Sequence, residues 1–209
     1  RTKSITDISS GGFQNTHGGG APFGGDAFLI KFSAAGNRIW ATYYGGAGND
    51  VGRSVATDAS GNVYLAGHTE STAGISSGGS QNTYGGGINN AFLVKFNAAG
   101  ARLWATYCGG TDNDGGWSVA TDASGNVYLA GFSQSFSGIS SGGFQNSIQG
   151  FQDAFLIKFN PGGSRQWGTY YGGTGYEYGK FVATDAFGNV YLTGETDGNS
   201  IISSGGFQN

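Results

Sequence analysis

Short runs of β-branched and aromatic residues alternate along the chain with clusters of Gly, Asn, Ser and Asp. The first block contains such runs at residues 27–32, 38–44, 53–57 and 63–67. Runs of this length, bounded by turn-forming residues, are typical of β-strands. No stretch of about ten residues combines a helical apolar period with the absence of glycine, which costs about 1 kcal/mol inside a helix relative to alanine. The pattern therefore predicts an all-β fold.

The predicted strands carry apolar side chains on both faces. In the first run, Phe28, Ile30 and Phe32 share one face, while Ala27 and Leu29 share the other. A sheet that is apolar on both faces must be covered on both. Sheets stacked face to face meet this requirement, so we predict four-stranded antiparallel blades of β-propeller type. A β-solenoid is the alternative, although its coils are usually much shorter than the period found in this chain.

The blocks recur at a nearly constant spacing. Ala-Phe-Leu begins at Ala27, Ala91 and Ala154, so the period is 64 and then 63 residues. The string Thr-Asp-Ala recurs in step with it, which indicates three copies of one structural unit. The predicted division is a linker at 1–15, repeats at 16–69, 70–132 and 133–195, and the start of a fourth linker at 196–209.

Three motifs of each repeat resemble a known family. They are Asp-Ala-Phe-Leu-Ile-Lys-Phe at 26–32, Trp-Ala-Thr-Tyr-Tyr-Gly-Gly at 40–46, and Ser-Val-Ala-Thr-Asp-Ala-Ser-Gly-Asn-Val-Tyr-Leu-Ala-Gly at 54–67. Together they are similar to the bacterial β-propeller repeats called SBBP repeats, over all three units. The departures are mild, with Asn90 in place of an Asp and Tyr176-Glu177 in place of Asn-Asp.

The resemblance carries further expectations. It implies no defined catalytic activity and a place in large secreted or surface proteins of bacteria. By analogy with other propellers, it also implies that the third and fourth strands of a repeat form the inner pair of a blade. The first and second strands would then form the outer pair.

Three repeats are too few for a closed ring, because closed propellers usually have four to eight blades. We therefore expect the chain to be incomplete as a ring on its own. The segments 2–15 and 196–209 are copies of the same linker, so the chain overruns its own period. The expected partners are a second copy of the chain or further repeats of the same protein, joined as a ring, a larger array or a filament.

Composition and charge exclude several classes of protein. Glycine accounts for 43 of 209 residues, yet aromatic residues make up 14%, which is too many for a disordered chain. Charged residues amount to only 11%, with a net charge of −3 and no cluster of Lys and Arg, so no nucleic-acid partner is expected. No apolar run has the roughly 18 residues that a membrane-spanning helix needs.

The residues with catalytic potential are few and scattered. His17 and His68 are the two histidines, and the position of His68 is occupied by Phe132 and Glu195 in the other repeats. Cys108 stands where the other repeats have tyrosine, which favours an apolar role over a reactive one. We therefore predict that the chain is not an enzyme.

Recurring acids allow two interpretations. One is a Ca²⁺ ion in each blade, since this cation takes carboxylate oxygens from flexible loops. The candidate ligands are Asp50, Asp112, Asp114 and Glu177. The other is that acids in the turns bind nearby backbone N–H groups without a metal, as expected for Asp58, Asp122 and Asp185. We expect no cofactor, and Ca²⁺ remains the alternative.

Tryptophan recurs at one position of each repeat, namely Trp40, Trp104 and Trp167. A row of aromatic rings suits repeated stacking on carbohydrate, whereas alternation within a strand favours packing in the core. Trp117 differs, because the other repeats have Arg53 and Lys180 at its position, so its ring is the one expected to be exposed.

These observations favour a non-enzymatic, extracellular structural or adhesive segment of a bacterial surface protein, which assembles into a larger array. The alternative is a multivalent glycan-binding module with one weak site in each blade.

Overall fold

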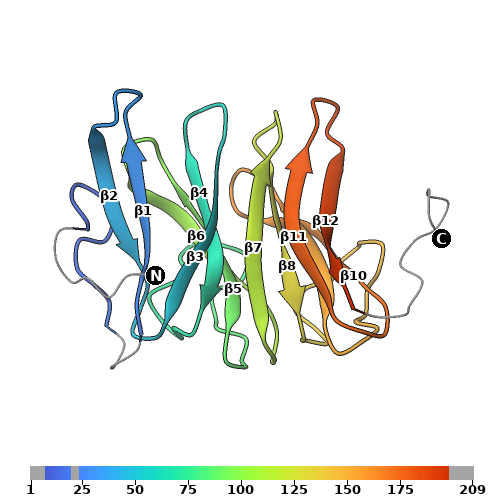
Figure 1. The fold of residues 1–209 in the computed structure, drawn as a ribbon. Coiled ribbons are helices and arrows are strands. Elements are labelled where there is room, and N and C mark those ends of the chain that lie inside the picture. Colours follow the sequence, from blue (N-terminus) through green and yellow to red (C-terminus); the bar gives the residue numbers. More distant parts are fainter. Residues whose placement is uncertain (1–7, 20–23, 198–209) are drawn as a thin grey trace.

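The computed structural model describes residues 8–19 and 24–197, which form an all-β structure without helices (Figure 1). Residues 1–7 and 198–209 of the two predicted linkers lie outside the described residues. Within the described part, no helix is long and apolar enough to cross a membrane. The strands are β1 (Ala27–Phe32), β2 (Arg38–Tyr44), β3 (Asp50–Thr57), β4 (Val63–Thr69), β5 (Asn90–Phe96), β6 (Arg102–Cys108), β7 (Asp114–Thr121), β8 (Val127–Ser133), β9 (Asp153–Phe159), β10 (Arg165–Tyr171), β11 (Glu177–Thr184) and β12 (Val190–Thr196).

The strands form four antiparallel sheets, but not one sheet per repeat. Two sheets have four strands, in the orders β3-β4-β5-β6 and β7-β8-β9-β10. The pairs β1–β2 and β11–β12 form two-stranded sheets at opposite ends of the row (Figure 1). The prediction of three four-stranded blades is therefore wrong in its layout, because each complete sheet joins the last two strands of one repeat to the first two of the next.

The long linker explains this layout. It returns the chain from the end of β4 to the start of β5, so that Thr69 pairs with Asn90 and Val63 with Phe96. β8 and β9 pair in the same way, from Ser133 with Asp153 onwards. Because the pairing strands β4, β5, β8 and β9 are apolar on both faces, the residue pattern alone does not distinguish this arrangement from a sheet made within one repeat. Within each complete sheet, the third and fourth strands of one repeat are neighbours, and so are the first and second strands of the next repeat. This order agrees with the inner and outer pairs that the resemblance implies.

The third strand of each repeat is longer than the pattern indicates. β3 begins at Asp50 rather than Arg53, and its pairing with β4 shifts between Gly52 and Ser54. This shift is a β-bulge, which leaves one extra residue on the longer strand. The bulged residue is Arg53 in β3, and β7 and β11 carry the same shift at Trp117 and Lys180.

The hairpin turns have the predicted chemistry. Asp58 Oδ1 accepts hydrogen bonds from the backbone N–H groups of Ser60 and Asn62, both at 3.0 Å. Gly61 adopts a φ of 75°, which a residue with a side chain rarely adopts. Asp122 and Asp185 make the same turn contacts in the later repeats.

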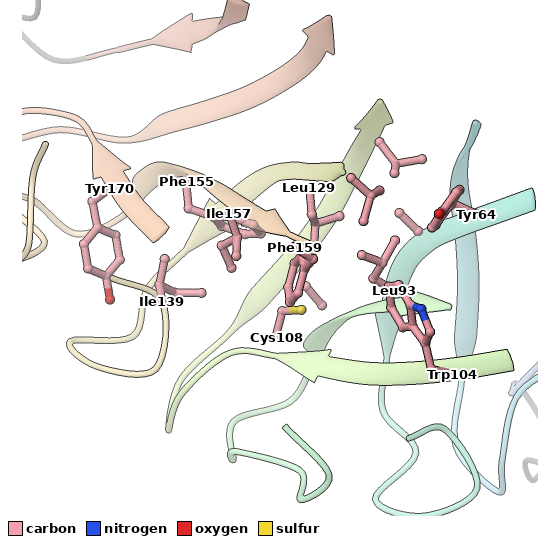
Figure 2. Packing of buried hydrophobic residues seen from close by; sticks show 14 of the residues in the cluster. Tyr64, Leu93, Trp104, Cys108, Leu129, Ile139, Phe155, Ile157, Phe159 and Tyr170 are labelled. Carbon is pink, nitrogen blue, oxygen red and sulfur yellow. The ribbon is translucent and has the colours of Figure 1, made fainter. Parts of the chain in front are cut away.

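Apolar side chains fill the space between successive sheets. Figure 2 shows the cluster between the two complete sheets, where Tyr64, Trp104, Phe155 and Phe159 are at most 5% exposed. Burying a side chain such as Phe159 contributes about 1.5–3 kcal/mol. β5 and β9 have an apolar face toward each neighbouring sheet, as the sequence predicts for a stack.

The first strands of successive sheets are also joined by hydrogen bonds. Ser54 Oγ accepts from Val119 N at 3.2 Å, and Ser118 Oγ accepts from Val182 N at 3.1 Å. These contacts place β3, β7 and β11 side by side, so a bulge on one strand faces the next sheet.

Candidate functional site

The acids that open β3, β7 and β11 are buried and hydrogen-bonded. Asp50 Oδ2 accepts from Gly46 N at 2.9 Å and from Ser71 Oγ at 2.8 Å, while Oδ1 accepts from Thr69 Oγ1. Asp114 has the equivalent partners in the next repeat. Each carboxyl group thus ties the loop before its strand to the end of the neighbouring strand.

Glu177 makes the equivalent contacts in the third repeat, with a longer side chain. It accepts from Gly173 N at 3.0 Å and from Thr196 Oγ1 at 2.7 Å. Its side chain is also buried, at 2% exposure. The recurring acid at this position is therefore a structural brace in all three repeats.

A second acid lies beside the first. A Cβ atom placed on Gly45 would lie 2.6 Å from Asp50 Oδ2 and 2.7 Å from Asp26 Cγ, so glycine is needed for both carboxyl groups to approach this backbone. Asp153 and Glu177 face Gly172 in the same manner. In the second repeat, the partner of Asp114 is the neutral Asn90, which removes the repulsion between two negative charges.

Burial raises the pKa of these acids. The pKa of Asp50 and that of Asp114 rise to about 6, because desolvation outweighs the hydrogen bonds that stabilise the charged form. Burial also raises the pKa of Asp26 and that of Asp153. Asp26 Oδ1 lies 3.7 Å from His17 Nε2.

The predicted Ca²⁺ ligands do not form one cluster. Asp112 is exposed, and Thr111 Oγ1 lies 3.3 Å from its carboxyl group, whereas Asp114 is buried with the hydroxyl partners described above. Among the described residues, no group of three or more His, Cys, Asp and Glu side chains is arranged to hold a metal ion. A Ca²⁺ ion in each blade remains a prediction.

Two of the recurring tryptophans lie between sheets. Trp40 and Trp104 are 3% and 5% exposed, and their indole N–H groups donate to Ala98 O and Pro161 O, each at 3.0 Å. These acceptors belong to the outer hairpin of the next sheet, so each indole connects two sheets. Trp167 is half-buried at the end of the stack. The buried rings do not present a face to a sugar in solution.

Trp117 belongs to a group of side chains that does not recur. Its ring stacks on Tyr178, with centroids 5.2 Å apart and planes inclined by 9°. Phe132 lies against both rings, at 5.3 Å from Trp117 and 5.8 Å from Tyr178. Lys180 Nζ lies 4.5 Å from the centroid of the Trp117 ring and 3.0 Å from Glu195 Oε2. We call these five side chains the aromatic cluster.

The aromatic cluster is one place where side chains of neighbouring strands depart together from the repeat. All three of its aromatic residues are half-buried, so part of their surface reaches solvent. The residue pattern indicates Trp117 as a residue that differs between repeats, whereas Phe132, Tyr178 and the ion pair were not expected beside it. The available signal was disagreement between repeats, since Val51 and Gly115 occupy the position of Tyr178.

Cys108 is buried in the apolar core between the two complete sheets, as Figure 2 shows. Burial raises the pKa of its thiol far above the ordinary value, which suppresses the reactive thiolate. Its structural environment therefore matches the apolar role that the sequence predicts.

Comparisons with known proteins relate the chain to repeat proteins. Residues 39–72 and 166–202 match the family model described as SBBP, Beta-propeller repeat. The first segment spans most of β2 to β4 and the second most of β10 to β12.

Two curated proteins are similar over most of the chain. An uncharacterized WD repeat-containing protein of Acanthamoeba polyphaga mimivirus is 27% identical over 200 residues, which covers 82% of this chain and 14% of that protein. Regulatory protein FlaEY of Caulobacter vibrioides is 28% identical over 165 residues, covering 78% of this chain and 17% of that protein. The chain spans less than a fifth of the length of either relative.

Proposed function

Because residues 39–72 and 166–202 match SBBP β-propeller repeats, we propose that this chain is a non-enzymatic structural and adhesive repeat segment that assembles into a larger array. One observation carries the proposal. In the described residues, the recurring acids accept hydrogen bonds within the framework, and two of the three recurring tryptophans are buried between sheets. The tyrosines at one position of each repeat, Tyr64, Tyr128 and Tyr191, donate to the acids of the hairpin turns. Side chains used in this way stabilise the fold and leave little chemistry for a substrate.

The linkers supply surface for contacts with partners. Phe136 and Phe151 lie in the linker between β8 and β9 and are 76% and 72% exposed. Exposed aromatic side chains grouped on one segment mark a candidate interaction surface. The rigid sheets hold this segment in place, which is how scaffolds commonly present binding loops.

We place this array outside the cell, on a bacterial surface or in a secreted protein. The support is the family resemblance, since such repeats are typical of large secreted or surface proteins. Protease treatment of intact cells that make the whole protein tests the location. Cleavage of the repeats without cell lysis is the expected result, and full protection of the repeats contradicts the proposed location.

Adhesion is tested with beads that carry the 209-residue chain. The expected result is retention of coated beads on surfaces coated with extracellular-matrix protein, compared with uncoated beads. A variant with Phe136→Ser and Phe151→Ser should reduce retention, because it removes two exposed aromatic rings. Equal retention of coated and uncoated beads overturns the adhesive role.

The aromatic cluster favours a second candidate function, the binding of a glycan. Trp117 and Tyr178 provide aromatic surface, and the ion pair of Lys180 with Glu195 supplies polar partners for hydroxyl groups. Screening of a glycan array tests this function, with Trp117→Arg as the matched variant because the first repeat has Arg53 there. Binding that is lost in this variant supports the site, and equal binding by both proteins excludes it.

A further inference from the structure

The two ends of the stack are halves of the same kind of sheet. β12 pairs only with β11, and β1 only with β2, among the described residues. In the complete sheets, the strands equivalent to β12 and β1 pair with each other, as β4 does with β5 and β8 with β9. Each end therefore supplies the half-sheet that the other end lacks.

Exposure at the ends marks the missing half-sheets. On the β12 side, Tyr191 is 58% exposed, whereas the equivalent Tyr64 and Tyr128 are 0% and 1% exposed. On the β1 side, Phe32 is 58% exposed, whereas the equivalent Phe96 is 0%. Tyr191 and Phe32 occupy positions that are buried in the complete sheets, but no neighbouring sheet covers them at the ends of the stack.

A groove next to β1 lies at the position where a tyrosine packs between the complete sheets. It has a volume of about 370 Å³ and is lined by Trp40 and Lys31 on one side and by Val55 and Val63 on the other. In the cluster between the two complete sheets, Tyr64 packs with Trp104, Val119 and Val127, which are the equivalents of three of these residues. The tyrosine equivalent to Tyr64 at the β12 end is Tyr191, so Tyr191 is the side chain that fits this groove.

The charges at the two ends are also complementary. In a complete sheet, Tyr64 donates to Asp58 Oδ2 at 3.1 Å, and Lys95 lies 3.6 Å from the same oxygen and over the tyrosine ring. At the β12 end, Tyr191 donates to Asp185 at 2.9 Å without such a lysine among the described residues. The equivalent lysine is Lys31, on the open strand β1.

We propose that β12 pairs with β1 of a second copy of this chain, so that the two half-sheets become one four-stranded sheet. The register of β4 with β5 places Val190 opposite Phe32 and Tyr191 opposite Lys31. Two copies of the 209-residue chain contain four complete sheets, and two such joints form two more, which gives six sheets for this pair. Six lies within the four to eight blades of closed propellers. The inference rests on the array function proposed above, and it names a second copy of the chain as the partner in that array.

The first test is the molar mass of the 209-residue chain, measured by light scattering over a dilution series. A single chain has a mass of 21.3 kDa. The expected result is a species with at least twice this mass that dissociates on dilution. A monomer at all concentrations up to about 100 μM overturns the proposal. Assembly and adhesion are separate measurements, so loss of bead retention with intact assembly contradicts the adhesive function alone.

A matched pair of glycine variants tests the joint itself. Gly36 and Gly188 both have positive φ, at 80° and 85°, and a Cβ atom on either would meet nothing within 4 Å. In the complete stack, the glycine equivalent to Gly36 lies against a tryptophan, since a Cβ on Gly100 would be 2.9 Å from Trp40. Gly36→Ala should therefore clash with Trp167 of the second copy and weaken association more than tenfold. Gly188→Ala carries similar backbone strain and should assemble, so equal assembly of both variants contradicts the joint.

Cysteine pairs test the register. Phe32→Cys with Val190→Cys places two thiols on directly opposite residues of the joint, within the Cα separation that a disulfide allows. Phe32→Cys with Leu192→Cys is the control, displaced by two residues. The native Cys108 is buried and does not compete. Oxidation should give covalently linked copies for the first pair and much less for the control. The reverse result overturns the proposed register.

Discussion

At the scale of single residues, the buried acids show how one residue type takes two structural roles. The acids in the hairpin turns could be assigned from the sequence, because Asp58, Ser60 and Asn62 are close along the chain. The brace formed by Asp50 could not, since its partners Thr69 and Ser71 lie about 20 residues away. The sequence allows a Ca²⁺ ligand at this position, and the structure adds the hydroxyl groups that donate to the carboxyl group.

The pKa values of these acids predict a pH dependence of stability. The pKa of Asp50 and that of Asp114 are raised to about 6, so folding favours their protonated forms. Their stabilising contribution is complete below about pH 4 and is lost as the pH rises through 6. Asp50→Asn and Asp114→Asn should therefore raise the free energy of unfolding at pH 8, by on the order of 2 kcal/mol per site, and change it little at pH 4.

Chemical denaturation at several pH values measures this effect. An asparagine can turn its oxygen toward Gly46 N and Ser71 Oγ, which keeps those two bonds, while its NH2 group donates to Thr69 Oγ1 and reverses the direction of the third. The exposed Asp112→Asn is the control for losing a carboxyl group at the surface. A benefit of Asp50→Asn that is the same at pH 4 and pH 8 contradicts the buried charge as its cause.

At the scale of elements, the hairpin turn between β7 and β8 depends on one side chain. Asp122 accepts from Ser124 N, Asn126 N and the Tyr128 hydroxyl, at 2.9–3.0 Å. We predict that Asp122→Ala lowers the free energy of unfolding by about 1–3 kcal/mol, because it leaves these donors without their acceptor. Thermal and denaturant unfolding measure the loss.

The matched variant is Asp122→Asn. In the other type of hairpin, Asn97 accepts from two backbone N–H groups with its amide oxygen, at 2.9 and 3.0 Å. Asparagine should therefore preserve most of the turn at position 122. An equal loss for both variants indicates that the charge of Asp122, rather than its hydrogen bonds to the backbone, stabilises this hairpin.

Contacts between elements depend on the serines beside the bulges. Ser118 Oγ accepts from Val182 N at 3.1 Å, which connects β7 to β11. Ser118→Ala should cost about 1–2 kcal/mol, because Val182 N loses its acceptor at a buried position. Hydrogen exchange at Val182 is the direct measurement, with faster exchange expected there than at the amides within the β7–β8 ladder. Unchanged exchange at Val182 would show that the bond is not made in solution.

The positions of the strands could largely be predicted from the sequence, but the pairing between strands could not. β1 and β2 lie at the predicted residues, since alternating side chains and turn residues are local signals. The start of β3 was missed because Asp50, Val51 and Gly52 resemble a loop, and only pairing with β4 makes them a strand. The assignment of β4 and β5 to one sheet required the linker to fold back.

At the scale of the whole molecule, a structural unit straddles two repeats. Residues 45–171 contain both complete sheets, whereas residues 70–196 contain one complete sheet and two halves, in a chain of equal length. In repeat proteins, stability is the sum of unit and interface contributions. We predict that the 45–171 chain unfolds cooperatively at a higher temperature than the 70–196 chain, as measured by calorimetry. A more stable 70–196 chain would show that the sequence repeat is also the folding unit.

The family resemblance is confirmed by the two matched segments, and the all-β class by the structure. Strand positions, turn chemistry and the repeat were determined by the sequence itself, because these features depend on residues that are close along the chain. Only the tertiary structure decided which strands share a sheet, and it assembled the aromatic cluster from strands of two repeats. The physical reason is that strands apolar on both faces fit several partners equally well, so long-range contacts select among them.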